Sequence, residues 1–305
     1  MEKVVIAGSG PAGMTAGIYT SRAELNPLIL EGATPGGQLV ISNEVENYPG
    51  FPEPMSGMEI ISRFRKQAER FGARFDARSV EGVAKSDDIF KIQTGDVVVE
   101  TRALIIATGA EARRLPIPSE KKFYGKGISG CATCDGFFFK GKNVIVVGGG
   151  NTAMDDAVFL TKFASKVTIV HRGKYRRADP IEVEKAKKNA KIQWMIPWVV
   201  EEILGNDFVT GVRLKNTESG ETFHLECKGI FVAIGQDPKT EVFKDVVKTD
   251  KKGFIVVQPG STRTSTDGIF ACGDVCDPKY KQAVVAAGQG CMAAMDVERY
   301  LGIKE

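Results

Sequence analysis

The sequence predicts an α/β protein in which a unit of strand, glycine turn, helix and strand occurs twice. The first copy opens at residues 3–13 and the second at residues 143–153. This context makes the glycine pattern typical of a dinucleotide site. A chain of 305 residues has room for two domains. We therefore expect two Rossmann-like, three-layer nucleotide-binding domains.

The remaining elements follow in chain order. The first turn leads to an expected helix at 14–23 and a strand at 27–31, and the second to a helix at 154–163 and a strand at 166–171. Further segments are expected to be strands at 103–109, 229–235 and 268–274, one more strand with turns at 250–260, and a terminal helix over about 282–301. Because the last of these follow the second copy, the second domain should be inserted into the first. We expect a discontinuous domain of residues 1–112 and 240–305, interrupted by residues 113–239.

The glycine pattern has three positions with different roles. They are Gly8, Gly10 and Gly13 in the first copy, and Gly148, Gly150 and Ala153 in the second. The first position allows the tight turn, the second lets the backbone approach a pyrophosphate, and the third permits close packing of helix on strand. The helix N-terminus then supplies amide donors to the phosphates. A glycine turn without a ligand is the alternative, but two copies in matched context make it a poor explanation.

The end of the second strand distinguishes the two sites. Glu31 lies 23 residues after Gly8, and His171 lies 23 residues after Gly148. A carboxylate in this position accepts hydrogen bonds from an unmodified ribose, as in FAD or NAD. The second site instead offers the basic groups His171, Arg172, Arg176 and Arg177, which attract the 2′-phosphate of NADPH. The first site is interpreted as an FAD site and the second as an NADPH site. The later lysines, up to Lys191, fit a solvated helix face.

A cysteine pair lies inside the expected insertion, at Cys131 and Cys134. This spacing suits a redox disulfide, half of a zinc site, or two inert thiols. A zinc site would need Cys272 and Cys276, whose spacing is wider than that of a zinc knuckle. Asp135 follows the pair directly and offers a carboxyl group for proton transfer during exchange. We favour the redox role and expect no metal.

Composition narrows the class of protein further. Hydrophobic residues make up 43% and charged residues 26%, and the net charge of +3 is too small to favour nucleic acid or a membrane as a partner. We expect neither a leader peptide nor a membrane span. Six cysteines are few for a disulfide scaffold of this length, which favours a cytoplasmic location. Together these features predict a flavoenzyme that moves electrons from a nicotinamide through FAD to the cysteine pair.

The chain resembles the low-molecular-weight thioredoxin reductases of the bacterial and archaeal type, in the FAD-dependent pyridine nucleotide-disulfide oxidoreductase family, along essentially its whole length. The matching segments are 8–13, 36–39, 44–51, 107–110, 131–136, 148–153, 273–275, 282–283 and 288–294. The combination and order of these segments are specific, although no single one is.

The resemblance implies a set of site residues. For FAD they are Gly8, Ser9, Gly10, Gly13, Glu31, Gly37, Gln38, Asn47, Gly109, Asp274, Gln282 and Ala283. For NADPH they are Gly148, Gly150, Asn151, Thr152, His171, Arg172, Arg176 and Arg177. Cys134 would lie nearer the flavin, Cys131 would attack the disulfide of thioredoxin, and Asp135 would be the acid–base partner.

The resemblance also implies a homodimer with thioredoxin as its substrate, and rotation of the inserted domain about linkers near 110–118 and 236–240. The family usually shows His-Arg-Arg in the basic slot, whereas this chain has His171, Arg172 and Gly173. The loss of one arginine weakens the expected preference for NADPH and leaves room for NADH, although Lys174 or Arg176 could compensate.

Two other functions fit parts of the sequence. One is a flavin-dependent reductase that acts on a different disulfide. The other is a nucleotide-dependent sensor whose cysteines are structural or hold zinc. The pattern itself does not identify the particular thioredoxin, the dimer interface, or a role for Cys227, Cys272, Cys276 and Cys291, for which a small buried apolar role is the default.

Overall fold

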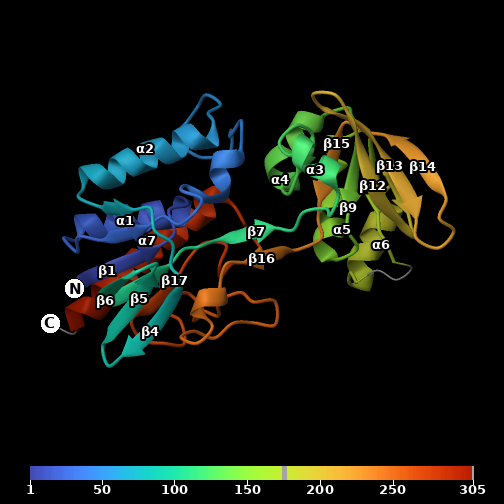
Figure 1. Ribbon diagram of the computed structural model, residues 1–305. Helices are drawn as coiled ribbons and strands as arrows, with labels where there is room; N and C mark the ends of the chain where they lie inside the picture. The colour runs from blue at the N-terminus through green and yellow to red at the C-terminus, as the bar shows by residue number, and fades with distance from the viewer. Residues whose placement is uncertain (174–176, 304–305) are drawn as a thin grey trace. The chain divides into compact units, whose positions relative to one another are not determined.

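The chain forms two compact units, seen in a computed structural model that describes residues 1–173 and 177–303. The first unit combines Met1–Glu111 with Asp237–Glu305, and the second is Ala112–Gln236 (Figure 1). The expected boundaries fell after residues 112 and 239, close to those of the two units. The prediction of an α/β fold with two Rossmann-like domains is confirmed.

The first unit is built on a parallel sheet. Its strand order is β3-β2-β1-β6-β17, formed by β1 (Glu2–Ala7), β2 (Leu28–Leu30), β3 (Arg74–Asp76), β6 (Val97–Ile106) and β17 (Ile269–Ala271). The late strand β17 pairs with β6 through Ile269 and Leu104, so the chain does return to the first unit. The amino-terminal part of β6 also continues into an antiparallel sheet with β4 (Gly82–Ser86) and β5 (Ile89–Thr94).

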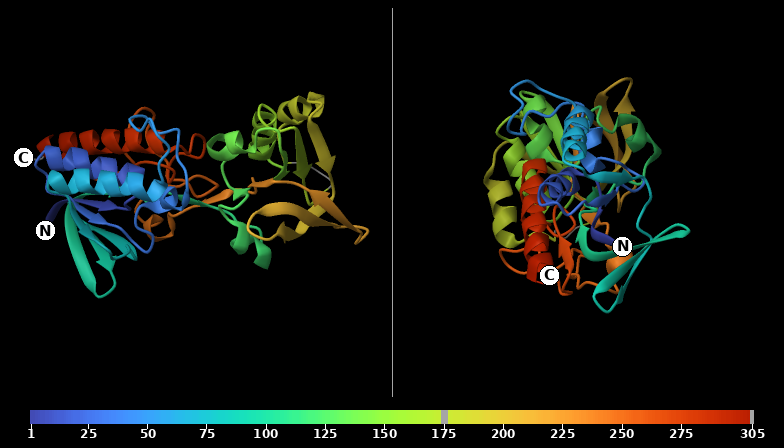
Figure 2. Two further views of the ribbon diagram at one scale, coloured as in Figure 1. Left: turned by 90° about the horizontal axis from the view of Figure 1, so that it is seen from above. Right: turned by 90° about the vertical axis from the view of Figure 1, so that its left-hand side faces the viewer.

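Helices cover the face of the parallel sheet that lies opposite the antiparallel strands. They are α1 (Pro11–Arg22), α2 (Gly57–Arg70) and α7 (Ala283–Ile303), and α1 and α7 lie side by side (Figures 1 and 2). Successive side chains of a strand point to opposite faces. Val4 and Ile6 accordingly join the helix-side core, whereas Val5 and Ala7 join the core under the antiparallel strands. The result is three layers.

Helix α1 begins at Pro11, three residues before the expected start at 14. Proline is favoured at the first helical position because its missing N–H would have no partner there. The chain between the main elements adds two short 3₁₀ helices, η1 (Gly37–Ile41) and η3 (Glu241–Phe243).

Of the strand with turns expected at 250–260, the turns are found but the strand is reduced to a single bridge. The structure has a turn there, with an isolated bridge between Thr249 and Ile255. The Asp250 carboxylate accepts hydrogen bonds from the amides of Lys252 (2.8 Å) and Phe254 (2.9 Å). A side chain that binds nearby amides in this way competes with ladder pairing. Gly253, at φ +89°, completes the turn.

The second unit repeats the same three layers. Its parallel sheet has the order β11-β10-β9-β15-β8, formed by β8 (Ile128–Ser129), β9 (Asn143–Val147), β10 (Lys166–Val170), β11 (Ile192–Met195) and β15 (Gly229–Val232). The antiparallel layer consists of β12 (Trp198–Gly205), β13 (Val209–Asn216) and β14 (Thr222–Glu226). The helices are α3 (Pro118–Phe123), α4 (Ala132–Asp135), α5 (Asn151–Leu160) and α6 (Pro180–Lys188), with the 3₁₀ helix η2 (Gly136–Phe139).

The strand β9 has the same division of side chains as β1. Val144 and Val146 pack with the helix α5, and Ile145 and Val147 pack with the antiparallel layer. The internal repeat detected in the sequence is therefore a repeat of packing as well as of turns.

Two short strands, β7 (Ala110–Ala112) and β16 (Gln236–Pro238), pair where the chain passes between the units. The Lys239 amide donates to the Gly109 carbonyl at 3.0 Å, and the Arg113 amide donates to the Gly235 carbonyl at 3.0 Å. The two connections therefore form one ribbon rather than two independent linkers.

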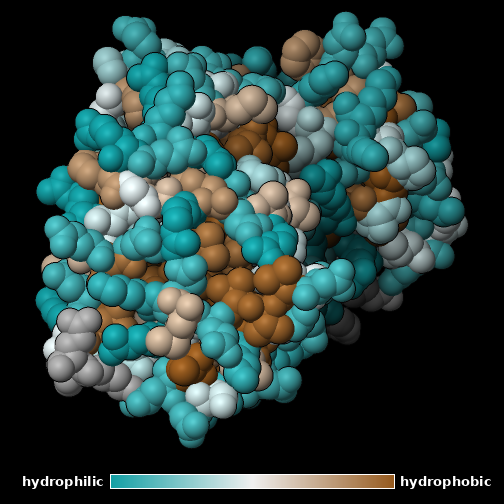
Figure 3. All heavy atoms as spheres, turned by 60° about the vertical axis from the view of Figure 1, so that its left-hand side comes forward, coloured by the Kyte–Doolittle hydropathy of each residue, from teal (hydrophilic) through white to brown (hydrophobic). Residues whose placement is uncertain are grey.

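Hydrophilic side chains surround several separate groups of apolar side chains on the face turned forward in Figure 3. Large apolar side chains that stay exposed include Tyr19 on α1, Met292 and Met295 on α7, and Phe137 in η2. Among the described residues, no helix has the length and apolar character needed to cross a membrane.

Candidate nucleotide and disulfide sites

The first glycine turn joins β1 to α1. Gly8 has φ +109°, and a Cβ there would lie 2.3 Å from the carbonyl oxygen of Ala107. A Cβ on Gly13 would lie 1.9 Å from the carbonyl oxygen of Gly8, so the helix packs on the turn with no room for a side chain. A Cβ on Gly10 would lie 3.9 Å from the nearest atom, the carbonyl oxygen of Gly36. The turn is thus tight at its first and third glycines and open at the second, which fits a pyrophosphate.

A second glycine loop closes over this turn. The Gly36 amide donates to the Ser9 hydroxyl at 2.9 Å, and a Cβ on Gly37 would lie 3.4 Å from the Cα of Gly10. Gln38 follows in η1. The loop therefore places residues 36–38 beside the open glycine, as a dinucleotide site in the first unit requires.

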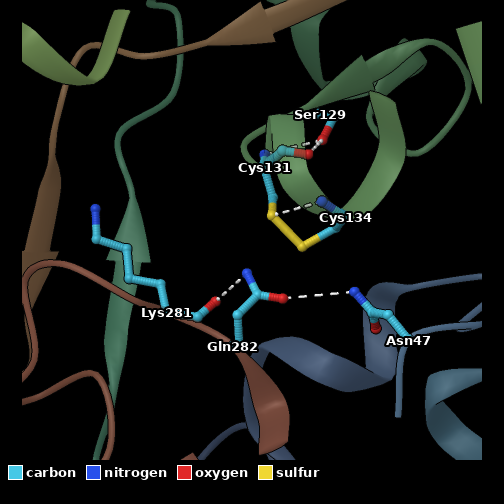
Figure 4. Close-up of a disulfide and its surroundings, with 6 residues drawn as sticks. All are labelled: Asn47, Ser129, Cys131, Cys134, Lys281 and Gln282. Carbon is cyan, nitrogen blue, oxygen red and sulfur yellow. Dashed lines mark hydrogen bonds between the residues drawn. A yellow bond between two sulfur atoms is a disulfide. The ribbon is translucent and has the colours of Figure 1, made fainter. Parts of the chain in front are cut away.

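Asn47 and Gln282 meet although they are 235 positions apart. The Asn47 side-chain amide donates to the Gln282 side-chain oxygen at 3.4 Å (Figure 4). Ala283, next to Gln282, is the first residue of α7. The structure therefore brings together candidate flavin contacts from both segments of the discontinuous unit.

Asp274 lies beyond the end of β17 and is half-buried. Burial, followed by repulsion from Asp277, raises the pKa of Asp274 to about 6, while Lys281 acts in the opposite direction. A ligand hydroxyl that donates to this carboxyl would offset its burial. A Cβ on Gly109, at φ +71°, would meet nothing within 4 Å. Beyond the carboxyl end of β17 there is therefore a carboxyl group at Asp274, and beyond that of β6 there is open space at Gly109.

Glu31 follows β2, and its side chain is only 7% exposed. Its Oε1 lies 2.6 Å from Nη1 of Arg65 on α2. Sequence reasoning identified Glu31 from its spacing but gave no signal for Arg65, because the pairing joins residues of different elements.

The second glycine turn joins β9 to α5. A Cβ on Gly148 would lie 2.3 Å from the carbonyl oxygen of Ala233, whereas a Cβ on Gly150 would meet nothing within 4 Å. Asn151 exchanges two hydrogen bonds of 2.7 Å with Asp179, one through each group of its side-chain amide. Thr152 is exposed on the first turn of α5. The turn has the open second glycine of a nucleotide site, but the Asn151 side chain is already engaged.

The basic slot follows β10. A Cβ on Gly149 would lie 2.4 Å from the His171 ring, so this ring packs directly on the glycine turn. The Arg177 amide donates to the Gly149 carbonyl at 2.8 Å, which returns the loop to the turn. Arg172 and Arg177 are exposed. Lys174 and Arg176 lie outside the described residues.

Of the later lysines, Lys185, Lys187 and Lys188 are on α6, as expected of a solvated helix face, whereas Lys191 lies beyond the helix and donates to the carbonyls of Thr161 and Ala164. Lys185 pairs with Glu182 at 3.1 Å and Lys187 with Glu184 at 2.8 Å, each within one helical turn. These residues offer surface ion pairs rather than a phosphate clamp.

Cys131 and Cys134 are joined by a disulfide with an S–S distance of 2.07 Å (Figure 4). Cys131 is the N-cap of α4, and its sulfur accepts a hydrogen bond from the Cys134 amide at 3.1 Å. An amide aimed at this sulfur at a helix N-terminus stabilises a thiolate when the pair is reduced. The arrangement therefore suits thiol–disulfide exchange.

Asp135 and Ser129 complete the surroundings of the disulfide. Burial raises the pKa of Asp135, and a hydrogen bond with the Ser129 side chain opposes that rise. The Ser129 hydroxyl also accepts the Cys131 amide at 2.9 Å (Figure 4). Ser129 thus touches both the cysteine and the acid. Ser129 was not predicted, since a serine two residues before a cysteine is no signal alone.

An aromatic surface follows the disulfide directly. Phe137 is 57% exposed, and its ring is 6.0 Å from Phe163 and 6.5 Å from Phe138. The three consecutive phenylalanines at 137–139 were the available signal, and the sequence analysis did not use it. An exposed aromatic beside a redox disulfide is suited to docking a protein substrate.

Cys227 and Cys272 are buried, as expected by default, whereas Cys276 and Cys291 are partly exposed. Burial raises the pKa of Cys227 and of Cys276 to about 12, and that of the fully buried Cys272 well above its ordinary value. Thiols with such pKa values stay protonated and unreactive. No group of three or more histidine, cysteine or acidic side chains within residues 1–173 and 177–303 could hold a metal ion.

Comparisons with known proteins agree on one family. The family model of pyridine nucleotide-disulphide oxidoreductases matches residues 2–290. The chain is 50% identical to a thioredoxin reductase of Rickettsia bellii (strain RML369-C), covering 98% of both chains. It is 47% identical to one of Mycolicibacterium smegmatis, covering 99% of this chain and 97% of the relative. The crystal structure of thioredoxin reductase from Streptococcus pyogenes MGAS5005 matches with a TM-score of 0.93 and 39% identity over 98% of each chain.

Proposed function

Because the chain belongs to the pyridine nucleotide-disulphide oxidoreductase family, we propose that it is a thioredoxin reductase. The observation that supports this most directly is the Cys131–Cys134 disulfide at a helix N-terminus, followed by the half-buried Asp135. Relatives that are 47–50% identical over nearly their whole length bear the same name. The enzyme would use pyridine nucleotide electrons to reduce the disulfide of thioredoxin.

FAD is the proposed flavin, and NADPH the proposed electron donor. When bound, the two would pass a pair of electrons to the disulfide. In the first unit the residues proposed to hold FAD include the open Gly10, Glu31 and the half-buried Asp274. In the second unit the open Gly150 would receive the pyrophosphate and His171 and Arg177 the 2′-phosphate.

The preference for NADPH over NADH depends on a basic slot that has Gly173 where the family usually has arginine. A charged hydrogen bond of that kind contributes about 1.5–3 kcal/mol. Its loss therefore reduces the preference for NADPH over NADH, but the other basic residues of the site still favour the 2′-phosphate. We propose NADPH as the better donor, with NADH as a slower one. Equal rates with both donors at the same low concentration would contradict a functional basic slot.

The chain's own chemistry is exchange between two dithiol–disulfide pairs. The Cys131 thiolate, stabilised by the Cys134 amide, would attack one sulfur of the thioredoxin disulfide and form a mixed disulfide. Cys134 would then attack Cys131, which closes the internal disulfide and releases reduced thioredoxin. Asp135 would give a proton to the departing thiolate. Trapping a mixed disulfide with Cys134→Ser, but not with Cys131→Ser, tests this assignment.

A homodimer is proposed as the assembly. Tyr19 on α1 is in hydrogen-bonding contact with Cys291 on α7, so the exposed apolar side chains of the two helices are neighbours. The exposed side chains of Tyr19, Met292 and Met295 form the apolar area that would be covered in a dimer. Sedimentation of the wild type and of Met295→Lys measures this: a monomer in both would contradict the assembly. A cytoplasmic location is proposed from the low number of cysteines, six in 305 residues.

The decisive experiment is an anaerobic titration of the purified protein. We expect a yellow protein whose flavin absorbance bleaches on adding NADPH and recovers on adding oxidised thioredoxin. A protein that takes up no flavin when FAD is supplied, or whose reduced flavin does not respond to thioredoxin, would contradict the proposed function.

A further inference from the structure

In the first unit, Glu31 is the candidate carboxylate for binding the ribose. It is held by Arg65, a residue outside the glycine pattern. Glu31 is 7% exposed, and its Oε1 is 2.6 Å from Nη1 of Arg65. The backbone of Glu31 is fixed as well, because its amide donates to the Asp76 carbonyl at 2.8 Å. A buried carboxylate in this geometry has one oxygen committed to the guanidinium.

Arg65 is itself fixed by two further contacts. Its Nε lies 2.9 Å from Oε1 of Glu69, one turn further along α2. Its guanidinium carbon lies 4.1 Å from the centroid of the Phe75 ring, in β3. The side chain therefore joins α2, β3 and the end of β2, and its planar group has little rotational freedom left.

The charge balance explains why such a clamp is useful. A carboxylate that is almost fully buried is costly unless it is paired and hydrogen-bonded. Pairing with Arg65 through Oε1 compensates the burial of the carboxylate and leaves Oε2 for another donor. The adenosine ribose of a flavin dinucleotide presents two hydroxyls, which are donors of the required kind.

We propose that Arg65 is a positioning residue for FAD, which acts by holding Glu31 in the orientation that accepts the ribose hydroxyls. The inference rests on the proposed function, since it takes the first unit to be the FAD site. In this role Arg65 does not touch the reacting part of the flavin. Its effect is on the affinity for FAD and not on the chemistry of the disulfide.

Arg63 offers a matched control on the same helix. It pairs with Glu59 at 2.9 Å, one turn away as in the Arg65–Glu69 pair, but both side chains are 53% exposed. Its guanidinium also lies over a phenylalanine ring, 5.6 Å from the centroid of Phe51. Arg63→Gln therefore removes the same charge from the same helix without touching Glu31.

The test measures FAD affinity of the flavin-free full-length protein by quenching of flavin fluorescence, with the flavin removed and added back. We expect Arg65→Gln to weaken FAD binding about 5- to 30-fold, Arg65→Lys to weaken it less, and Arg63→Gln to change it less than about twofold. Glu31→Gln should weaken it as well. In the Glu31→Gln background, Arg65→Gln should add less than about twofold.

The double variant separates positioning from simple attraction of the pyrophosphate. A loss of affinity on Arg65→Gln that persists in the Glu31→Gln background, and that shrinks with added salt, would overturn the inference. An Arg65→Gln variant that binds FAD as tightly as the wild type would overturn it too. If Arg65→Gln does not fold, Arg65→Lys in the two backgrounds gives the same comparison. A wild-type protein that binds no FAD would refute the proposed function itself, which is a different result.

Discussion

At the scale of single residues, hydrogen bonding and burial decide which side chains can take part in thiol–disulfide exchange. Cys131 accepts an amide hydrogen bond, Asp135 has a pKa raised by burial, and Cys276 has a pKa raised to about 12, first by burial and then by nearby acids. The same amino acid, cysteine, is reactive in one environment and inert in another. Position in the fold, more than residue identity, decides which thiol takes part in exchange.

Replacing Cys134 with serine tests the electron route. We expect the variant to keep its bound flavin and the bleaching by NADPH, while thioredoxin turnover falls by more than about a hundredfold because no internal disulfide can form. Flavin absorbance and a coupled thioredoxin assay measure the two properties. Cys291→Ser is the matched control and should behave as the wild type. Thioredoxin turnover by Cys134→Ser at the wild-type rate would remove the cysteine pair from the mechanism.

Replacing Ser129 with alanine tests the hydrogen bond to Asp135. The bond opposes the rise in the pKa of Asp135 caused by burial, so its loss raises that pKa further. The limb of the pH–rate profile that disappears in Asp135→Asn should therefore move to higher pH in Ser129→Ala. Ser129→Thr keeps the hydroxyl and should restore the wild-type profile. A limb that stays in place, or moves to lower pH, would contradict the role given to Ser129.

At the scale of elements, the sequence predicted the parts whose signals are local. The two strand–turn–helix–strand units were predicted because glycines at fixed spacing follow apolar runs, and the terminal helix was expected over about 282–301 and found as α7, Ala283–Ile303. The strand with turns expected at 250–260 has its turns but only one bridge, because the Asp250 side chain binds nearby amides. The pairs Asn47–Gln282 and Glu31–Arg65 join distant segments, and no local pattern could predict such contacts.

The short helix η2 carries the aromatic surface beside the disulfide, and Phe137→Ala tests its role. We expect KM for thioredoxin to rise about 5- to 30-fold because an aromatic anchor at an interface contributes about 1–2 kcal/mol. Reduction of a small disulfide reagent should be unchanged, since it needs no docking surface. Phe208→Ala removes an equally exposed aromatic, which is 67% exposed, from the loop between β12 and β13 and should have no effect. Equal loss with protein and reagent would indicate damage to the disulfide site instead.

At the scale of the whole molecule, one packing plan is used twice. Each unit places helices on one face of a parallel sheet and antiparallel strands on the other, and alternate side chains of β1 and β9 divide between the two cores. Each unit has its own hydrophobic cores, and the proposed ligands belong to different units. The units should therefore respond to their ligands separately.

Thermal unfolding of the intact chain tests this independence. A ligand at a hundred times its Kd stabilises the unit that binds it by about 2.7 kcal/mol. We expect two transitions in calorimetry of the flavin-free protein, of which FAD raises one and NADPH the other. Riboflavin, which lacks the adenosine part, is the control and should move neither transition strongly. A single transition that either nucleotide shifts equally would contradict the separation.

The position of β17 and α7 at the end of the chain has a consequence for biosynthesis. Synthesis proceeds from the amino end, so residues 112–236 leave the ribosome complete while the first unit still lacks its last strand and helix. Until α7 emerges, the side of α1 that packs against it, where Gly290 lies against Ala12, stays uncovered. The inserted half should mature first on the nascent chain, and a chaperone that shields the waiting helix would act in that interval.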